Sequence, residues 1–175
     1  ALIDIIGVAD TQSLTVAEGG VVSFDRAVTH DAAVLTTTGV LEYLEHATTA
    51  ANAAVTGTID GAALNNGVVL LNNASTTTFA NAIGSDQPIK TLTMTTVGIF
   101  NSDVSALGAT SANSKVNQFK GNLTLGASKY VITGVAGEAM FNGTGDQVVT
   151  GKVVGAGAEQ GVIDNAKASG TLTFA

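Results

Sequence analysis

The chain has 175 residues, of which 12% are charged, and its formal net charge is −7. The absence of cysteine excludes a disulfide framework and a thiolate metal site, and seven basic residues in an acidic chain argue against a nucleic-acid partner, which requires a basic face. No segment approaches the roughly 18 consecutive apolar residues of a membrane-spanning helix, so the sequence predicts none.

The N-terminal piece, residues 1–54, differs from the rest of the chain. Residues 39–54 read GVLEYLEHATTAANAA, in which Leu41, Leu44 and the following small residues form an apolar stripe at helical spacing. Alanine favours helix, and no glycine follows Gly39 in this segment. We therefore expect a short helix near 39–54, which would cover an open edge of a sheet.

Residues 55–80 are repeated at 149–175. Both segments begin with VTG and end with TFA, and half of the aligned positions are identical when Gly170 is treated as an insertion. Such self-similarity is typical of repeat architectures. We expect one domain, 1–175, with a repeat body over 55–175. The second copy ends where a further unit is expected, which either a longer array or a neighbouring copy would supply.

Strand signals fill the repeat body. Residues 91–95 (TLTMT) and 170–174 (GTLTF) alternate with period two, which puts one row of side chains inward and a threonine row outward. Glycine, asparagine and aspartate mark turns between these runs. The sequence predicts an all-β fold, a parallel β-solenoid with one short helix. A β-sandwich of jelly-roll type is the alternative, because the second copy starts 94 residues after the first, at Val149 and Val55, and this repeat length is long for one solenoid coil.

Several phrases carry a family resemblance: VTGTIDG (55–61), TTTFANAIG (76–84), KTLTM (90–94), FNGTG (141–145) and GTLTFA (170–175). They resemble the passenger regions of bacterial autotransporters, most of all the Thr/Gly/Asn-rich repeats of rickettsial surface antigens. The resemblance covers roughly residues 14–28 and 55–175. It implies export, an extracellular location at the bacterial cell surface and a threonine-rich β-solenoid.

Two segments suggest metal ligands. Glu42 and His46 are four residues apart and would share a face of the expected helix, where a carboxylate and an imidazole could bind a metal. Asp146 ends the segment GTGD, which is similar to part of the calcium-binding Gly/Asp nonapeptide repeat. The alternatives are a solvated helix face and a simple turn.

Calcium is the one cofactor that the sequence leaves open. Asp60, Asp103 and Asp164 are scattered along the repeat body and could bind calcium together with backbone carbonyls, because oxygen-only sites leave little trace in a sequence.

No catalytic residue is predicted. Solenoid enzymes that cleave acidic polysaccharides need clustered carboxylates and basic residues, whereas the single arginine and six lysines of this chain are spread along it. No GxSxG nucleophile motif is present. We therefore expect a protein that is not an enzyme.

The leading hypothesis is an exported structural protein that assembles with copies of itself into a filament or layer. Thr171, Leu172, Thr173 and Phe174 are the expected assembly strand, because an unpaired strand with alternate apolar residues is a template for pairing with another chain. One alternative is an adhesin-like passenger module that binds a host surface or glycan. A second is a carbohydrate-active β-helix protein.

Overall fold

The computed structural model describes residues 2–4, 14–24, 28–35, 39–43, 53–72, 76–112 and 115–175. Regular secondary structure in these residues consists entirely of strands. This part of the chain accordingly contains no helix long and apolar enough to span a membrane. The strands are β1 (Leu2–Asp4), β2 (Leu14–Val16), β3 (Val21–Phe24), β4 (Val28–Leu35), β5 (Val40–Tyr43), β6 (Ala53–Gly61), β7 (Asn66–Leu71), β8 (Thr77–Phe79), β9 (Ile89–Met94), β10 (Gly98–Phe100), β11 (Val104–Ser111), β12 (Val116–Phe119), β13 (Leu123–Ile132), β14 (Glu138–Phe141), β15 (Gln147–Gly155), β16 (Val162–Asn165) and β17 (Leu172–Phe174).

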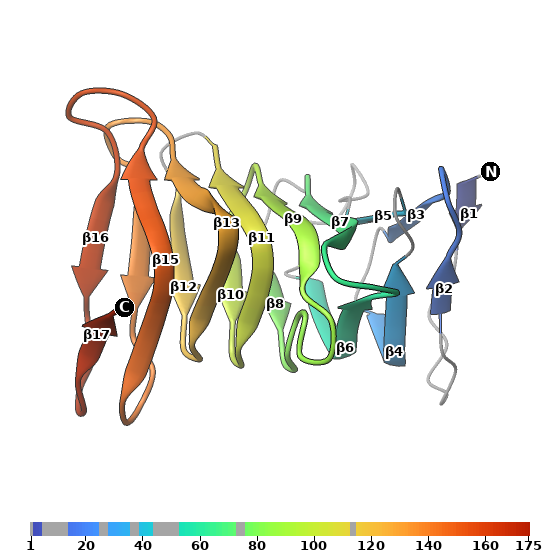
Figure 1. The fold of residues 1–175 in the computed structure, drawn as a ribbon, viewed down its shortest axis with the longest axis horizontal. Coiled ribbons are helices and arrows are strands. Elements are labelled where there is room, and N and C mark those ends of the chain that lie inside the picture. Colours follow the sequence, from blue (N-terminus) through green and yellow to red (C-terminus); the bar gives the residue numbers. More distant parts are fainter. Residues whose placement is uncertain are drawn as a thin grey trace.

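The strands form two parallel sheets, and the chain alternates between them (Figure 1). The odd-numbered strands follow one another from β1 to β17 in a nine-stranded sheet, and the even-numbered strands run from β2 to β16 in an eight-stranded sheet. Each strand stacks on the strand two positions earlier, which makes a β-solenoid of about six turns. The predicted solenoid is confirmed. The jelly-roll alternative is wrong, because jelly rolls are built from antiparallel strands.

The longer strands bend within the coil. β11 pairs with β13 in two stretches, and the register shifts between Ala106 and Ala109. β4 and β13 have similar shifts against their partners β6 and β15. Gly57 and Gly151 lie at two of these bends with φ angles of 107° and 99°, a region that L side chains rarely adopt. A bent strand therefore contributes to two sides of the coil.

The sequence repeat corresponds to one turn of the solenoid. Val55 pairs with Phe79 in the first copy, and Val149 pairs with Phe174 in the second, so the beginning and end of each copy lie side by side. The two copies therefore fold as the same unit, and they have positive φ at the same three positions: Gly57 and Gly151, Asn65 and Glu159, and Gly67 and Gly161.

The two copies nevertheless start at different points of the coil. Residues that are paired in successive turns form a row along the solenoid. Val55 is in the row that continues with Phe79, whereas Val149 is in the row that contains Leu123 and Val104. The second copy is therefore rotated about the solenoid axis relative to the first.

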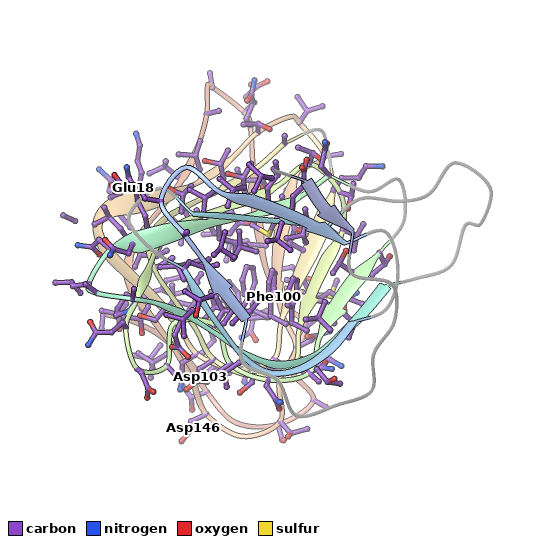
Figure 2. The ribbon with its side chains drawn as sticks, turned by 90° about the vertical axis from the view of Figure 1, so that its right-hand side faces the viewer. Glu18, Phe100, Asp103 and Asp146 are labelled. Carbon is purple, nitrogen blue, oxygen red and sulfur yellow. The ribbon has the colours of Figure 1, made fainter. Side chains whose placement is uncertain are left out.

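Stacked side chains fill the interior. Phe79, Phe100, Phe119 and Phe141 lie on one row in successive turns, with ring centroids 5.2, 5.0 and 5.5 Å apart and each residue at most 1% exposed. Figure 2 shows Phe100 inside the coil. Burial of these four rings removes apolar surface from water, and the close approach of the rings adds to the stabilisation.

The period-two alternation predicted for residues 91–95 is confirmed in β9. Leu92 and Met94 are fully buried, whereas Thr91 and Thr93 are half-buried on the outer surface. β-Branched threonine suits this position because its side chain packs well on a pleated surface.

The helix expected over residues 39–54 is wrong where the structure can be compared with it. Val40–Tyr43 is the strand β5, and β6 already begins at Ala53; residues 44–52, including Leu44 and His46, lie outside the described residues. β5 pairs with β3 on one side and β7 on the other. Pairing on both sides outweighs the local helix propensity, which is a weak determinant by comparison.

Candidate functional site

The expected assembly strand lies at the end of the nine-stranded sheet. Leu172, Thr173 and Phe174 form β17, which pairs in parallel with β15 and has no second neighbour in the sheet. Thr171 precedes this strand, and its N–H donates to Asp146 Oδ1 at 2.8 Å. Three of the four predicted residues therefore belong to an edge strand, at the same end of the coil as β16, the edge strand of the eight-stranded sheet (Figure 1).

The last turn leaves inward-facing side chains uncovered. Phe174 is 50% exposed, although its partner Val149 in the preceding turn is fully buried. Ile163 on β16 is 46% exposed, although its partner Ala139 is fully buried. One face of Phe174 contacts the last ring of the aromatic stack, Phe141, with centroids 6.2 Å apart in an edge-to-face arrangement. This turn, β16 and β17, is called the open end below.

The sequence analysis identified β17 but missed the contribution of β16. Val162 and Ile163 are each 46% exposed, and they correspond within the repeat to Val68 and Val69 of the first copy. Val69 is fully buried under the next turn. Aligning the two copies could therefore have indicated that Ile163 is an inward-facing strand residue at a position that a further turn would cover, whereas Val162, like Val68, faces outward.

The structure describes two of the three predicted metal ligands, Glu42 and Asp146, and these two lie apart. Glu42 lies on β5 and accepts a hydrogen bond from Asn72 Nδ2 at 3.3 Å. Asp146 lies at the turn before β15, five strands further along the sheet, and His46 is outside the described residues. No group of three or more His, Asp or Glu side chains suited to a metal ion occurs among the described residues.

Two of the scattered aspartates bind backbone instead. Asp60 Oδ1 accepts from the N–H of Asp86 at 2.9 Å, and Asp103 Oδ1 accepts from the N–H of Asn122 at 2.7 Å. Asn122 Oδ1 in turn accepts from the N–H of Val148 at 2.8 Å. Each of these side chains satisfies an N–H in a later turn of the solenoid, where the strand ladder does not supply a partner. Asp103 and Asp146 mark this side of the coil in Figure 2.

A group of polar side chains interrupts the apolar interior. Thr77, Ser111, Asn117 and Tyr130 are at most 1% exposed. Asn117 Oδ1 accepts from the N–H of Gly98 at 2.9 Å, but Asn117 Nδ2 and the three hydroxyls form no well-directed hydrogen bond within the described residues. Burial raises the pKa of Tyr130 to about 12, and the side chains of Ser111 and Asn117 beside its hydroxyl reduce this rise.

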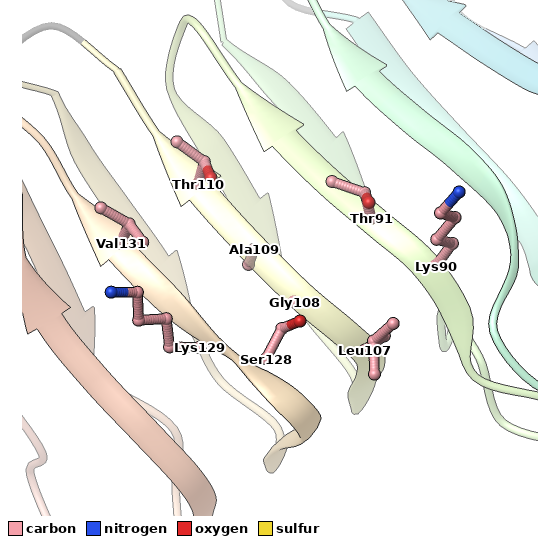
Figure 3. Close-up of a pocket in the computed structure, with 9 residues that line it drawn as sticks. All are labelled: Lys90, Thr91, Leu107, Gly108, Ala109, Thr110, Ser128, Lys129 and Val131. Carbon is pink, nitrogen blue, oxygen red and sulfur yellow. The ribbon is translucent and has the colours of Figure 1, made fainter.

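A groove crosses the outer face of the nine-stranded sheet over β11 (Figure 3). Its volume is about 340 Å³. Gly108 lies between β9 and β13 and is covered by Ser128, because a Cβ added at Gly108 would lie 2.8 Å from Ser128 Cβ. The hydroxyl of Ser128 is turned toward Gly108. The residues that give the groove its chemistry are the ammonium groups of Lys90 and Lys129 and the hydroxyls of Thr91, Thr110 and Ser128. We refer to it as the Gly108 groove.

Comparison with protein-family models, with curated proteins and with solved structures finds no match to this chain.

Proposed function

We propose that this protein is a non-catalytic structural protein, exported to the bacterial cell surface, whose copies assemble by strand pairing between the ends of their solenoids. The observation that carries the proposal is the open end, where the inward-facing Ile163 and Phe174 are about half exposed on two edge strands. Edge strands with uncovered apolar side chains are templates for pairing with a further chain.

The direction of the strands favours a head-to-tail arrangement. Every pairing in both sheets is parallel, with β1 and β2 at one end and β17 and β16 at the other. A second copy that is translated along the axis would therefore present β1 to β17 and β2 to β16 with matching polarity. This contact joins two different surfaces, and repeated head-to-tail contacts that do not close into a ring produce filaments.

The chemistry of the open end agrees with burial by a partner. β17 has the sequence Leu-Thr-Phe and carries no charge, whereas natural edge strands are commonly protected by charged or proline residues. An added turn would cover Phe174 and Ile163 as the last turns cover Val149 and Ala139. It would also supply hydrogen-bond partners for the free side of each edge strand.

The resemblance of the Thr/Gly/Asn-rich phrases to autotransporter passengers supports the location. Those passengers are exported, and a threonine-rich outer surface suits a protein displayed in water. The location and the assembly are separate parts of the proposal, so the experiment below tests assembly alone.

The test compares two double variants with the same change in charge. Ile163→Asp/Phe174→Asp places charges at inward-facing positions of the open end, and Leu64→Asp/Val135→Asp places them at apolar residues in turns, which are 64% and 73% exposed. Sedimentation velocity and negative-stain electron microscopy would be recorded for the purified chain and both variants over a range of concentrations, with circular dichroism to verify folding.

We expect the unaltered chain and the turn variant to form long particles and the open-end variant to remain monomeric. Assembly of all three proteins alike would refute strand pairing at this end. An unaltered chain that stays monomeric at every concentration would refute self-assembly itself.

A further inference from the structure

Three of the seven basic residues of this acidic chain lie on one face of the solenoid. Lys90 is on β9, Lys129 on β13 and Lys152 on β15, and all three side chains are exposed. β9, β11, β13 and β15 are consecutive in the nine-stranded sheet. In a chain with a net charge of −7, this face therefore stands out as a local concentration of positive charge.

The arrangement of these lysines is unfavourable in the isolated chain. Lys129 and Lys152 are directly paired in the register of β13 and β15, so two positive charges stand on neighbouring strands. Like charges at opposite positions of a sheet destabilise it. Neither lysine forms an ion pair within the described part of the chain, and neither side chain donates to a described acceptor. An anion held between them would remove this repulsion.

The Gly108 groove adds a shaped surface to this charge. Gly108 pairs with Thr91, and Ala109 pairs with Tyr130, which puts Gly108 between Thr91 and Lys129 on the outer row. Figure 3 shows Lys90 and Lys129 on opposite sides of Gly108. The hydroxyls of Thr91, Thr110 and Ser128 add donors for anionic oxygens, and none of the described residues that line the groove carries a carboxylate.

The geometry points to a binding site for an acidic polysaccharide, with the chain of sugars running along the solenoid axis across Lys90, Lys129 and Lys152. Neighbouring strands are about 4.8 Å apart, so the three lysines span roughly 14 Å from β9 to β15. That span calls for an extended polyanion in preference to a single small anion. The surface is open and rich in hydroxyls, which suits sugar hydroxyl and acidic groups.

A polysaccharide fits this surface better than a nucleic acid. Single-stranded nucleic acids bind where aromatic side chains stack on the bases, and the groove lining in the described part of the chain contains no aromatic side chain. The site is also separate from the open end, because it lies on the outer face of internal strands. The inference therefore does not depend on the proposed assembly.

Two double variants test the site at equal net charge. Lys129→Gln/Lys152→Gln removes the paired lysines. Lys115→Gln/Lys120→Gln removes two exposed lysines that directly precede and follow β12 in the other sheet and do not line the groove. Isothermal titration calorimetry would use heparin as the sulfated probe, polygalacturonate as the carboxylated probe and dextran as the neutral probe. A single-stranded oligonucleotide would serve as the nucleic-acid probe. All titrations would be repeated in Ile163→Asp/Phe174→Asp, so that a result does not depend on assembly.

We expect one or both acidic polysaccharides to bind and dextran not to bind. The affinity for the acidic polysaccharide should fall about tenfold in Lys129→Gln/Lys152→Gln. In the unaltered chain it should also fall about tenfold when the salt concentration rises from roughly 50 to 200 mM. The Lys115→Gln/Lys120→Gln protein should bind as the unaltered chain does. The difference between heparin and polygalacturonate identifies sulfate or carboxylate as the recognised group. Equal loss in both variants, or no binding of either polysaccharide at low salt, would overturn the site. Tighter binding of the oligonucleotide would overturn the choice of ligand.

Discussion

Tyr130 provides a direct test of whether the solenoid interior excludes water. Its side chain is fully buried, its ring packs edge-to-face on Phe119 with centroids 5.8 Å apart, and burial raises its pKa from 10 to about 12. Deprotonation in the folded state would place a phenolate in an apolar interior. In the unfolded chain the same hydroxyl is solvated and titrates near 10.

The sign and size of the effect follow from this difference in pKa. Between pH 10 and 12 the unfolded chain has released the Tyr130 proton while the folded chain has kept it, so alkaline pH favours unfolding. The stabilisation is complete below pH 10 and is lost as the pH rises toward 12. The free energy of unfolding should fall by about 1.4 kcal/mol between pH 8 and pH 11, and by about 2.7 kcal/mol once both states are deprotonated.

The assay is urea unfolding at a series of pH values for the unaltered chain and Tyr130→Phe. The two proteins differ only at residue 130, so the difference between the two curves isolates Tyr130. Absorbance near 295 nm follows tyrosinate formation in the folded state, where the chain has only one other tyrosine, Tyr43. Parallel stability curves for the two proteins between pH 8 and 11 would refute the reasoning, because Tyr130 would then titrate equally easily when folded and unfolded.

Two further predictions concern the stability of the coil. Phe119→Ala removes a central ring of the aromatic stack and should lower the free energy of unfolding in urea by about 3–5 kcal/mol. Phe174→Ala, at the half-exposed open end, should lower it by about 1 kcal/mol or less. Equal losses in the two variants would contradict the stacked core. Gly67→Ala should lower the free energy of unfolding by more than about 2 kcal/mol, because φ is 81° at this residue and the new Cβ would collide with Leu35. Gly145 has a similar φ of 83° but open space around it, so Gly145→Ala should lower the free energy of unfolding by only about 1 kcal/mol. A Gly67→Ala protein as stable as Gly145→Ala would show that Leu35 does not pack there.

Local patterns predicted the strands but not their position in the coil. The alternation in residues 91–95 identified β9, and the VTG…TFA repeat identified a unit that folds the same way twice. The rotation between the two copies was beyond prediction, since successive members of the aromatic stack, Phe79, Phe100, Phe119 and Phe141, are 21, 19 and 22 residues apart. With no fixed period, the number of residues between two motifs does not determine their angular offset.

The helix error has a similar origin. The segment from Val40 to Tyr43 is consistent with helix by local propensity, but Val40 and Leu41 pair with Val21 and Val22 on one side and with β7 on the other. Only long-range pairing distinguishes the two structures, and a single sequence does not display it.

The candidate sites depend on register in the same way. Lys90, Lys129 and Lys152 have unequal spacings in the sequence, and only the parallel pairing of β9 to β15 places them on one face. The outward rows thus receive charge and hydroxyls, whereas the inward row at the open end carries Ile163 and Phe174 without charge. Charged outer rows oppose association of the sheets side by side. At the open end the one charge on β16, that of Asp164, also lies in the outward row, so it does not protect the inward-facing apolar side chains. If the copies assemble as proposed, this distribution of side chains favours contact at the ends and leaves the outer face free for the proposed polysaccharide.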